Sequence, residues 1–309
     1  MSKSEPLLSI CIPTNGVVSW VFPVLDSIYA DGIDEGLFEV ILTDNGNNAE
    51  FFSLMSEYAI KHSNLKYIKT NAYEFLNEIE AYKNANGLFI KFINHRTLLK
   101  KGTLQYFIDF VNKYKGEKPE VYFLNGELKK KNQIDVYQQF EQYVQALSYY
   151  SSWSTGMGFW KENFERIVGF DRFNVLFPHT DILFSNRKAE KYIIDNSVLL
   201  EEISAGKTPK GKYNLFNAFA VEYMRIILNL YCDGAISKQC FLSVKKGNLK
   251  FLRELYFNYI FLKRSCSYDL SDYKKSISVF YSLWQIKKSV PGLLIKKIFN
   301  KAKKLILGR

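Results

Sequence analysis

The sequence predicts an α/β protein with a doubly wound, mainly parallel sheet and a helical extension at its C-terminal end. In the N-terminal third, short apolar runs alternate with segments whose apolar residues recur at helical spacing, which is typical of parallel strands connected by helices. From Leu215 onward the spacing is helical to the end of the chain. A length of 309 residues with 47% hydrophobic residues suffices for one large domain, or for a domain plus an extension.

The predicted strands and helices follow one another along the chain. The first strands are expected at Leu7–Pro13, Phe38–Thr43, Leu65–Thr70 and Leu88–Ile93, with helices at Val18–Tyr29, Phe51–His62 and Leu76–Ala85. Beyond them we expect helices at Gly102–Lys115, Val136–Tyr150, Asn163–Val168 and Asp181–Lys191, strands at Val121–Asn125 and Tyr192–Leu200, a basic turn at Lys129–Lys131, and a loop of small residues at Ser151–Gly158. The polar, glycine-containing linker Ala205–Asn214 separates an α/β domain of residues 1–204 from a helical extension of residues 205–309.

Cysteine spacing and hydropathy exclude several classes of protein. The four cysteines form no CxxC pair, so neither a zinc site nor a disulfide framework is expected. Because the start Met1–Pro6 is polar, we expect no signal peptide. The sequence contains no run of 18 consecutive apolar residues, so we expect no membrane-spanning helix. We therefore expect a protein of the cytoplasm.

In an open parallel sheet, ligands bind beyond the carboxyl ends of the strands. The segments that follow the predicted strands at this edge are Thr14–Gly16, Asp44–Asn48 and Asn94–Thr97. Polar side chains dominate all three segments, and they are the first candidates for a binding site.

Two of these segments resemble the opening of glycosyltransferase family 2, of the bacterial surface-polysaccharide type. Pro13, Thr14 and Asn15 in SICIPTNG match a Pro-Thr-Tyr-Asn motif, and Asp44, Asn45 and Gly46 in EVILTDNGNN match an Asp-Asn-Gly-Ser turn. Later matches extend the resemblance over roughly Leu7–Ile194: Asn77, Gly102, Leu104, the stretch Thr155–Asp171, and Asp181. The resemblance implies a GT-A fold, a nucleotide-sugar donor and transfer of its sugar to a saccharide acceptor.

The resemblance also assigns roles to individual residues. Asp44 would accept the N3–H of a uracil base, and Pro13, Thr14, Asn15 and Asn77 would complete the donor site. Asp181 would act as the catalytic base on the acceptor hydroxyl, with His179 assisting it or binding the acceptor. The alternatives are ordinary ones: a turn or helix-cap aspartate at position 44, a helix N-cap at position 181, and a loop histidine bonded to backbone at position 179.

The sequence departs from the family at the metal motif. Where family members end the fourth strand with aspartates, this chain has Asn94-His95-Arg96-Thr97 and no carboxylate. Mg²⁺ and Mn²⁺ prefer oxygen ligands, and a neighbouring arginine repels them, so no metal cofactor is expected. Arg96 could instead neutralise the diphosphate through two hydrogen bonds, and Asn94 and His95 could contact phosphate. Alternatively, His95 could ligate a metal, or catalysis could have been lost.

The C-terminal tail carries nearly all of the net charge. Tyr273–Arg309 contains ten basic residues and no Asp or Glu, which leaves about +1 of the total of +11 for the first 272 residues. Between the lysines of Val290–Leu307, apolar residues recur at helical spacing: Leu294, Ile295, Ile298, Phe299, Ala302, Leu305 and Ile306. This pattern predicts a basic amphipathic helix in residues 290–309 that binds an anionic membrane surface. The alternatives are a helix packed on the body, and nucleic-acid binding, for which no recognition motif is present.

Together these observations favour a glycosyltransferase that moves a sugar from a nucleotide sugar, most simply a UDP-sugar, to a saccharide acceptor. The membrane-seeking tail favours a lipid-linked acceptor, as in the assembly of O-antigen or capsule, and a location on the inner face of the cell membrane. The alternative is a non-catalytic, glycosyltransferase-like binding module at the membrane, which the missing carboxylates would suit. No nucleic-acid partner is expected.

Overall fold

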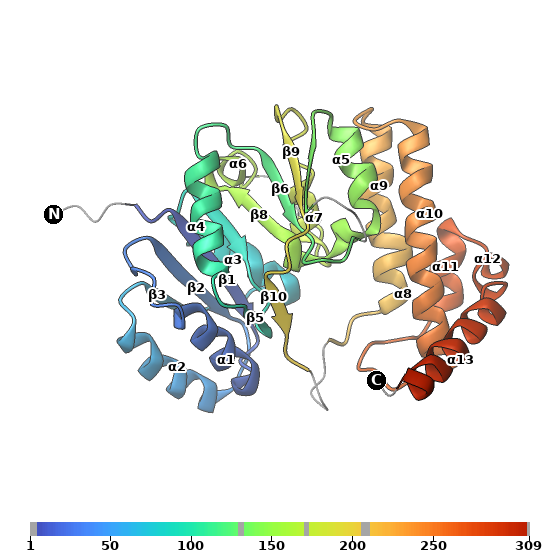
Figure 1. The fold of residues 1–309 in the computed structure, drawn as a ribbon, viewed down its shortest axis with the longest axis horizontal. Coiled ribbons are helices and arrows are strands. Elements are labelled where there is room, and N and C mark those ends of the chain that lie inside the picture. The colour runs from blue at the N-terminus through green and yellow to red at the C-terminus, as the bar shows by residue number, and fades with distance from the viewer. Residues whose placement is uncertain (1–4, 129–132, 170–172, 205–210, 308–309) are drawn as a thin grey trace. The chain divides into compact units, whose positions relative to one another are not determined.

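The structure, a computed structural model, describes residues 5–128, 133–169, 173–204 and 211–307, and side chains up to residue 300. The chain divides into two compact units (Figure 1). The first comprises Met1–Tyr143 and Tyr150–Ser204, and the second comprises Val144–Tyr149 and Ala205–Arg309. The predicted turn Lys129–Lys131, most of the predicted linker, Asp171 of the family motif, and the side chains of the last nine tail residues lie outside this description.

The first unit contains a sheet of eight strands in the order β3-β2-β1-β4-β8-β6-β9-β7. Its strands are β1 (Leu8–Thr14), β2 (Phe38–Asp44), β3 (Leu65–Lys69), β4 (Phe89–Phe92), β6 (Glu120–Phe123), β7 (Ile134–Tyr137), β8 (Met157–Trp160) and β9 (Tyr192–Asp195). Strands β3, β2, β1 and β4 are parallel to one another, as are β6 and β9, whereas β8 and β7 run antiparallel to their neighbours. The predicted α/β fold with a mainly parallel sheet is confirmed.

Helices cover both faces of this sheet, because successive strand residues point to opposite faces. On one face, Leu8, Ile10 and Ile12 of β1 join a buried core that includes residues of α1 (Val18–Tyr29), α2 (Ala49–Lys61) and α4 (Thr103–Tyr114). On the other face lies α3 (Asn77–Lys83), whose Tyr82 ring packs edge-on against Phe159 at 5.0 Å. The remaining short helices of the unit are η1 (Glu74–Leu76), η3 (Ser154–Gly156), α6 (Lys161–Glu165) and α7 (Pro178–Leu183). The first half of α5 (Phe140–Leu147) and most of η2 (Ser148–Ser152) also belong to it.

The strand ends at the predicted site are level with one another. Thr14 of β1 lies opposite Asp44 of β2, and Asp44 lies opposite Lys69 of β3. A second, two-stranded antiparallel sheet pairs β5 (Thr97–Leu99) with β10 (Leu200–Glu202) directly after the fourth strand. This pairing brings the residues that follow β4 next to the end of the first unit.

The prediction was wrong in the later part of the unit. The last two residues of the expected loop Ser151–Gly158 instead begin β8, where only a glycine fits because a Cβ at Gly158 would lie 2.7 Å from the Phe89 ring. The expected helix Val136–Tyr150 begins as the edge strand β7, whose residues alternate between exposed and half-buried. In place of the predicted helix Asp181–Lys191, the structure has the shorter helix α7, which begins earlier, at Pro178, and ends at Leu183.

The second unit is helical, as predicted from Leu215 onward. Its helices are α8 (Leu215–Asn217), η4 (Ala218–Glu222), α9 (Tyr223–Cys232), α10 (Lys238–Leu255), η5 (Tyr256–Phe261), α11 (Tyr273–Phe280), α12 (Leu283–Lys287) and α13 (Val290–Leu307). Inside it, the buried Asn248 donates hydrogen bonds to the Phe219 carbonyl at 2.8 Å and to the Tyr281 hydroxyl at 3.0 Å. These bonds connect α10, η4 and the end of α11.

Candidate active site

Asn77 holds the carboxyl ends of three strands together. Its amide nitrogen donates to the carbonyls of Thr14 at 3.1 Å and Thr43 at 2.9 Å, and its side-chain oxygen accepts the Thr70 hydroxyl at 2.7 Å. Asn77 is the first residue of α3 and is 2% exposed, so α3 is fixed against the ends of β1 and β2. In this structure Asn77 therefore shapes the predicted donor site and has no amide proton left for a ligand.

Asp44 is fully buried and its carboxylate accepts three hydrogen bonds. Oδ1 accepts the Gly46 backbone N–H at 2.8 Å, and Oδ2 accepts the Tyr67 hydroxyl and the Lys69 ammonium, both at 2.9 Å. The Lys69 side chain is 40% exposed and also bonds the Gly46 carbonyl. A carboxylate offers about four acceptor positions. Three of these positions are therefore occupied within the protein.

Gly46 allows the turns after β1 and β2 to meet. A Cβ at Gly46 would lie 2.1 Å from the backbone oxygen of Asn15, so no larger residue fits here. Asn48 strengthens the same contact by donating its side-chain amide to the Gly16 carbonyl at 3.0 Å, and Asn45 N–H bonds the Thr14 carbonyl at 3.1 Å. The Pro13–Asn15 motif and the Asp44–Gly46 motif thus form one connected surface, on which the side chain of Asn15 is exposed.

His95 joins this surface through Thr14. The Thr14 hydroxyl accepts the Gly16 N–H at 3.0 Å and lies 2.8 Å from His95 Nδ1. Because the hydroxyl proton has no other acceptor among the described residues, we assign it to Nδ1, which leaves Nε2 of the imidazole as a donor. Burial and the charge of Arg96 lower the pKa of His95 to about 4, so the ring is neutral near pH 7. A neutral ring with a free N–H suits contact with a phosphate oxygen.

Arg96 is paired with β10. Its guanidinium donates to Glu202 Oε2 at 3.0 Å and to the Ile203 carbonyl at 3.3 Å, while the Ile203 N–H bonds the Arg96 carbonyl at 2.8 Å. Of the five guanidinium N–H groups, three remain unused among the described residues. Asn94 turns its side chain inward, where it accepts the Arg96 backbone N–H at 3.2 Å.

His179 and Glu78 form a buried pair on the α3 side of the sheet. His179 Nδ1 lies 3.2 Å from Glu78 Oε1, and Nε2 donates to the Ser152 carbonyl at 3.1 Å. A carbonyl can only accept, so Nε2 is the donor in this bond. Both nitrogens are occupied, which makes His179 a link between α3, α7 and the Ser152 segment. It lies in α7, not in a loop.

Asp181 lies in the first turn of α7. Its carboxylate accepts the Asn174 backbone N–H at 2.6 Å, and the helix N-cap is Phe177, so the alternative of Asp181 as an N-cap is wrong. Burial raises the pKa of Asp181, against the opposing effects of the Asn174 hydrogen bond and of His179. A half-buried carboxylate with a raised pKa has the chemistry expected of a general base.

The predicted residues therefore fall into two groups connected by α3. Thr14, Asp44, Asn77 and His95 meet at the strand ends, and Asn77 is followed directly by Glu78, the partner of His179. Arg96 is oriented toward β10 by its bonds to Glu202 and Ile203. The described contacts do not join Asp181 to the strand-end group.

Sequence reasoning missed four charged residues at or beside the site: Lys69, Glu78, Lys91 and Glu202. Only Lys91 had a visible signal, a charged residue inside the apolar run LFIKFI. It is fully buried in β4, and its ammonium donates to the carbonyls of Phe92, Thr155 and Met157 at 2.8 to 2.9 Å. The other three are recognisable only once their partners are known.

The residues after β4 do not fit a divalent cation. Within the described part of the chain, no three His, Cys, Asp or Glu side chains are gathered where they could share a metal ion. Both ring nitrogens of His95 are taken, Nδ1 by the Thr14 hydroxyl and Nε2 by its proton, and Arg96 places a permanent positive charge beside the ring. Because of this donor set, we derive no step through a metal.

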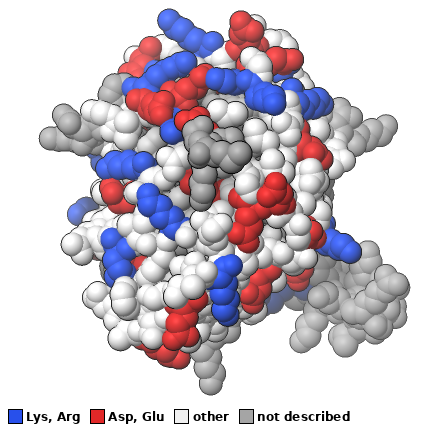
Figure 2. All heavy atoms as spheres, turned by 90° about the vertical axis from the view of Figure 1, so that its left-hand side faces the viewer, with Lys and Arg blue, Asp and Glu red and all other residues white. Residues whose placement is uncertain are grey.

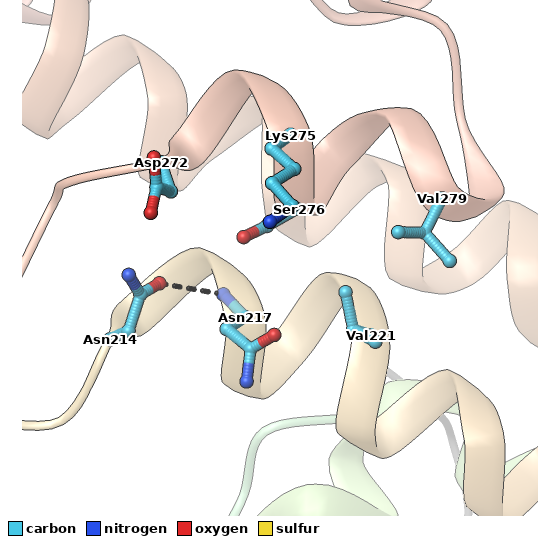
Figure 3. A pocket seen from close by; sticks show the side chains of 7 residues that line it. All are labelled: Asn214, Asn217, Val221, Asp272, Lys275, Ser276 and Val279. Atoms are coloured by element: carbon cyan, nitrogen blue, oxygen red, sulfur yellow. Dashed lines mark hydrogen bonds between the residues drawn. The ribbon is translucent and has the colours of Figure 1, made fainter.

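A pocket of about 240 Å³ lies in the second unit, apart from all predicted site residues. Figure 3 shows the side chains of Asn214, Asn217 and Val221 on one side of it, and those of α11 on the other: Lys275, Ser276 and Val279, with Asp272 just before the helix. The Asn214 side chain is turned back to accept the Asn217 N–H at 2.9 Å, as the dashed line marks. The pocket therefore belongs to the packing of the helical unit.

Comparison with solved structures finds the same fold in proteins that bind nucleotide sugars. Residues 1–349 of S. aureus TarS match with a TM-score of 0.59 at 14% identity, over 92% of this chain and 81% of that one. The same protein in complex with UDP-GlcNAc matches with a TM-score of 0.55 at 16% identity, over 93% of this chain and 83% of that one. The mannosyltransferase PcManGT from Pyrobaculum calidifontis, in complex with GDP-Man and Mn²⁺, matches with a TM-score of 0.55 at 13% identity, over 93% and 87%.

No family model and no curated protein sequence matches the chain. The structural likeness therefore establishes the fold alone: an α/β fold with a mainly parallel sheet and a helical C-terminal region, shared with TarS and the mannosyltransferase.

Proposed function

We propose that the protein is a glycosyltransferase that moves a sugar from a UDP-sugar to a saccharide acceptor. The observation that supports this most is the connected surface at the ends of β1 and β2, where Asp44, Thr14 and His95 meet. It lies at the edge of the sheet where such folds bind ligands, and solved proteins of this fold hold UDP-GlcNAc or GDP-Man.

In this proposal each group has a separate task. Asp44 accepts the base N–H after Lys69 turns aside, and His95 Nε2 and the unused N–H groups of Arg96 donate to the diphosphate. Asp181 removes the proton of the acceptor hydroxyl while its oxygen bonds to the anomeric carbon and the bond from that carbon to the diphosphate breaks. The proton ends on Asp181, and the electron pair of the broken bond leaves with the nucleoside diphosphate.

The acceptor is proposed to be a lipid-linked saccharide in the assembly of a surface glycan such as O-antigen or capsule, handled at the inner face of the cell membrane. The support is indirect: it is the resemblance of the motifs and the basic amphipathic tail. Among the described residues, no helix is both long enough and apolar enough to cross a bilayer.

The direct test is calorimetric titration of the chain with UDP, followed by donor hydrolysis. Asp44→Asn keeps an acceptor for the Gly46 N–H but removes the charge, and we expect a loss of UDP affinity on the order of tenfold to a hundredfold. Asp34→Asn is a matched control, because Asp34 also accepts the N–H of a glycine two residues on, at 2.9 Å, and lies on the surface. Equal UDP affinity of folded Asp44→Asn and wild type would reject Asp44 as the base acceptor.

A non-catalytic binding module is the second candidate, and two contacts favour it. Arg96 is neutralised by Glu202, and both nitrogens of His179 are occupied inside the protein. This candidate predicts saccharide or partner binding without donor hydrolysis. Absence of both UDP binding and hydrolysis, in a folded chain, would favour it over the enzyme.

A further inference from the structure

The helix α13 presents an apolar side that the protein leaves uncovered. Ile295 and Ile298 are each 60% exposed, and Phe299 is 73% exposed. The three residues are three or four positions apart, or adjacent, so they share one side of the helix. Leu293, two positions before Ile295, is half-buried, and α13 contacts η5 of the same unit. The helix is therefore held by the second unit while this side remains free.

A second large apolar residue is exposed just before α13. Trp284 of α12 is 68% exposed, and the Lys288 ammonium lies 4.3 Å from the centre of its ring. Tryptophan next to lysine is typical of the boundary between lipid and water, where the ring meets the headgroups and the ammonium meets phosphate.

The charged residues that neighbour these side chains in the sequence have one sign. Lys287, Lys288, Lys296 and Lys297 flank them, and no acidic residue occurs from Tyr273 to the end of the chain. On the face of the molecule shown in Figure 2, by contrast, acidic and basic side chains are interspersed. Such a positive surface attracts anionic surfaces and repels a copy of itself.

We propose that α12 and α13 together form a membrane-docking surface, on which Trp284, Ile295, Ile298 and Phe299 enter the headgroup region of an anionic bilayer. A second copy of the chain fits less well, because pairing of α13 helices would bring their lysines together. A nucleic acid would use the lysines but leave the apolar side chains in water. This surface does not depend on the proposed sugar transfer, since it contains none of the residues of the candidate active site.

The experiment is co-sedimentation of the full chain with vesicles of phosphatidylcholine alone and of phosphatidylcholine with phosphatidylglycerol in equal parts. We expect binding to the anionic vesicles only. Lys296→Gln with Lys297→Gln should lower the partition coefficient by roughly 30-fold, at about 1 kcal/mol per lysine. The control pair is Lys100→Gln with Lys101→Gln, two adjacent exposed lysines on the first unit, which should leave partitioning unchanged.

The apolar contribution is tested separately. Ile298→Ser with Phe299→Ser should lower partitioning by more than about tenfold, whereas Ile60→Ser, at a residue of α2 that is 86% exposed, should not. The tryptophan fluorescence should shift to the blue on anionic vesicles, because Trp284 is the most exposed of the four tryptophans, Trp153 being half-buried and Trp20 and Trp160 buried. Trp284→Phe should abolish the shift. UDP affinity should be the same in all of these variants.

Three results would overturn the proposal. The first is equal binding to neutral and anionic vesicles, and the second is unchanged partitioning of the tail variants. The third is a chain that dimerises in sedimentation velocity through Ile298 and Phe299 but ignores vesicles, which would make a second copy the occupant.

Discussion

At the scale of single residues, His179 and Asp181 differ sharply although only one residue separates them on α7. Both nitrogens of the histidine are engaged, by Glu78 and the Ser152 carbonyl, whereas the half-buried carboxylate of Asp181 has a single hydrogen bond among the described residues, from the Asn174 N–H. The side chain that retains chemical freedom is therefore Asp181.

We predict that Asp181→Asn abolishes sugar transfer and leaves UDP affinity near that of the wild type. A base acts on the acceptor, so the affinity for the donor does not depend on it. Because the pKa of Asp181 is raised, wild-type turnover should fall as the pH drops through a value above 3.8, where the base takes up a proton. Transfer assays over a range of pH measure this fall in turnover. Asp109→Asn, at an exposed site, is the control. Wild-type turnover by Asp181→Asn would contradict the role of Asp181 as the base.

A second prediction concerns Arg96 and the divalent cation. Transfer should persist in excess EDTA and be lost in Arg96→Ala, because the arginine is the permanent positive charge available to a diphosphate leaving group. Arg166→Ala, which removes a surface arginine paired with Glu162 at 3.6 Å, should have little effect. Activity that disappears in EDTA and returns with Mn²⁺ would show instead that the protein uses a metal.

The candidate site could be predicted from the sequence only in part. Thr14, Asp44 and Asn77 follow from the motifs at the strand ends, and the structure does bring them together. Their charged neighbours could not be predicted, since Lys69, Glu78 and Glu202 reach their partners over 25, 101 and 106 positions of sequence. No local pattern encodes a pair that only the folded sheet brings together.

At the scale of elements, Lys91 joins β4 to the segment that leads into β8. Its ammonium bonds the Thr155 and Met157 carbonyls and lies 5.3 Å from the centre of the Phe123 ring. Burial lowers the pKa of Lys91 to about 7, but three carbonyl acceptors match the three protons of the charged form. These three hydrogen bonds therefore stabilise the charged form of Lys91, whereas burial destabilises it.

We predict that Lys91→Met lowers the free energy of unfolding by about 2–4 kcal/mol, because methionine fills the space but leaves buried carbonyls without a donor. Lys66→Met is the matched control, a strand lysine on the exposed side of β3, and should change stability by less than about 0.5 kcal/mol. Urea unfolding of both variants measures the difference. A Lys91→Met chain as stable as the wild type would show that the carbonyls need no charged partner.

The elements themselves were predictable where a buried strand is followed by a helix, as for β1 with α1 and β2 with α2. They were not predictable where strands are short or carry small residues. β8 reads as a loop because its glycine accommodates the Phe89 ring, and β5 and β10, three residues each, have too little pattern to detect.

At the scale of the whole molecule, we expect the free energy of unfolding to vary with pH because of the carboxyl group of Glu120. This fully buried carboxylate of β6 accepts the side-chain amides of Asn163 at 2.6 Å and Asn186 at 2.8 Å. Burial raises the pKa of Glu120 from 4.5 to about 7, against the opposing effect of these two hydrogen bonds. The folded chain therefore keeps a proton that the unfolded chain has lost between these two values.

We predict that the contribution of the Glu120 carboxyl group to the free energy of unfolding is fully present below pH 4.5, declines as the pH rises, and is lost above about pH 7. The difference should be on the order of 3 kcal/mol. Glu120→Gln keeps the acceptor for both amides and cannot ionise, so its stability relative to the wild type should increase over the same range. The urea midpoints of the wild type and of Glu120→Gln, measured at pH 4.5 and at about pH 7, test this prediction. The same change of midpoint with pH in both proteins would contradict the role of Glu120.

The position of β8 has a consequence for the way the protein is made. Strands β1 to β4 come from residues 8–92, but β8, the strand that joins them to β6, comes from residues 157–160. On the ribosome, the first four strands can assemble while the open edge of β4 still waits for its neighbour. Lys91 lies in the middle of that edge, opposite the position that Gly158 will take. A charged side chain at this edge discourages pairing with another nascent chain. Once Thr155 and Met157 have been synthesised, their carbonyls accept hydrogen bonds from the same ammonium, and β8 pairs with β4.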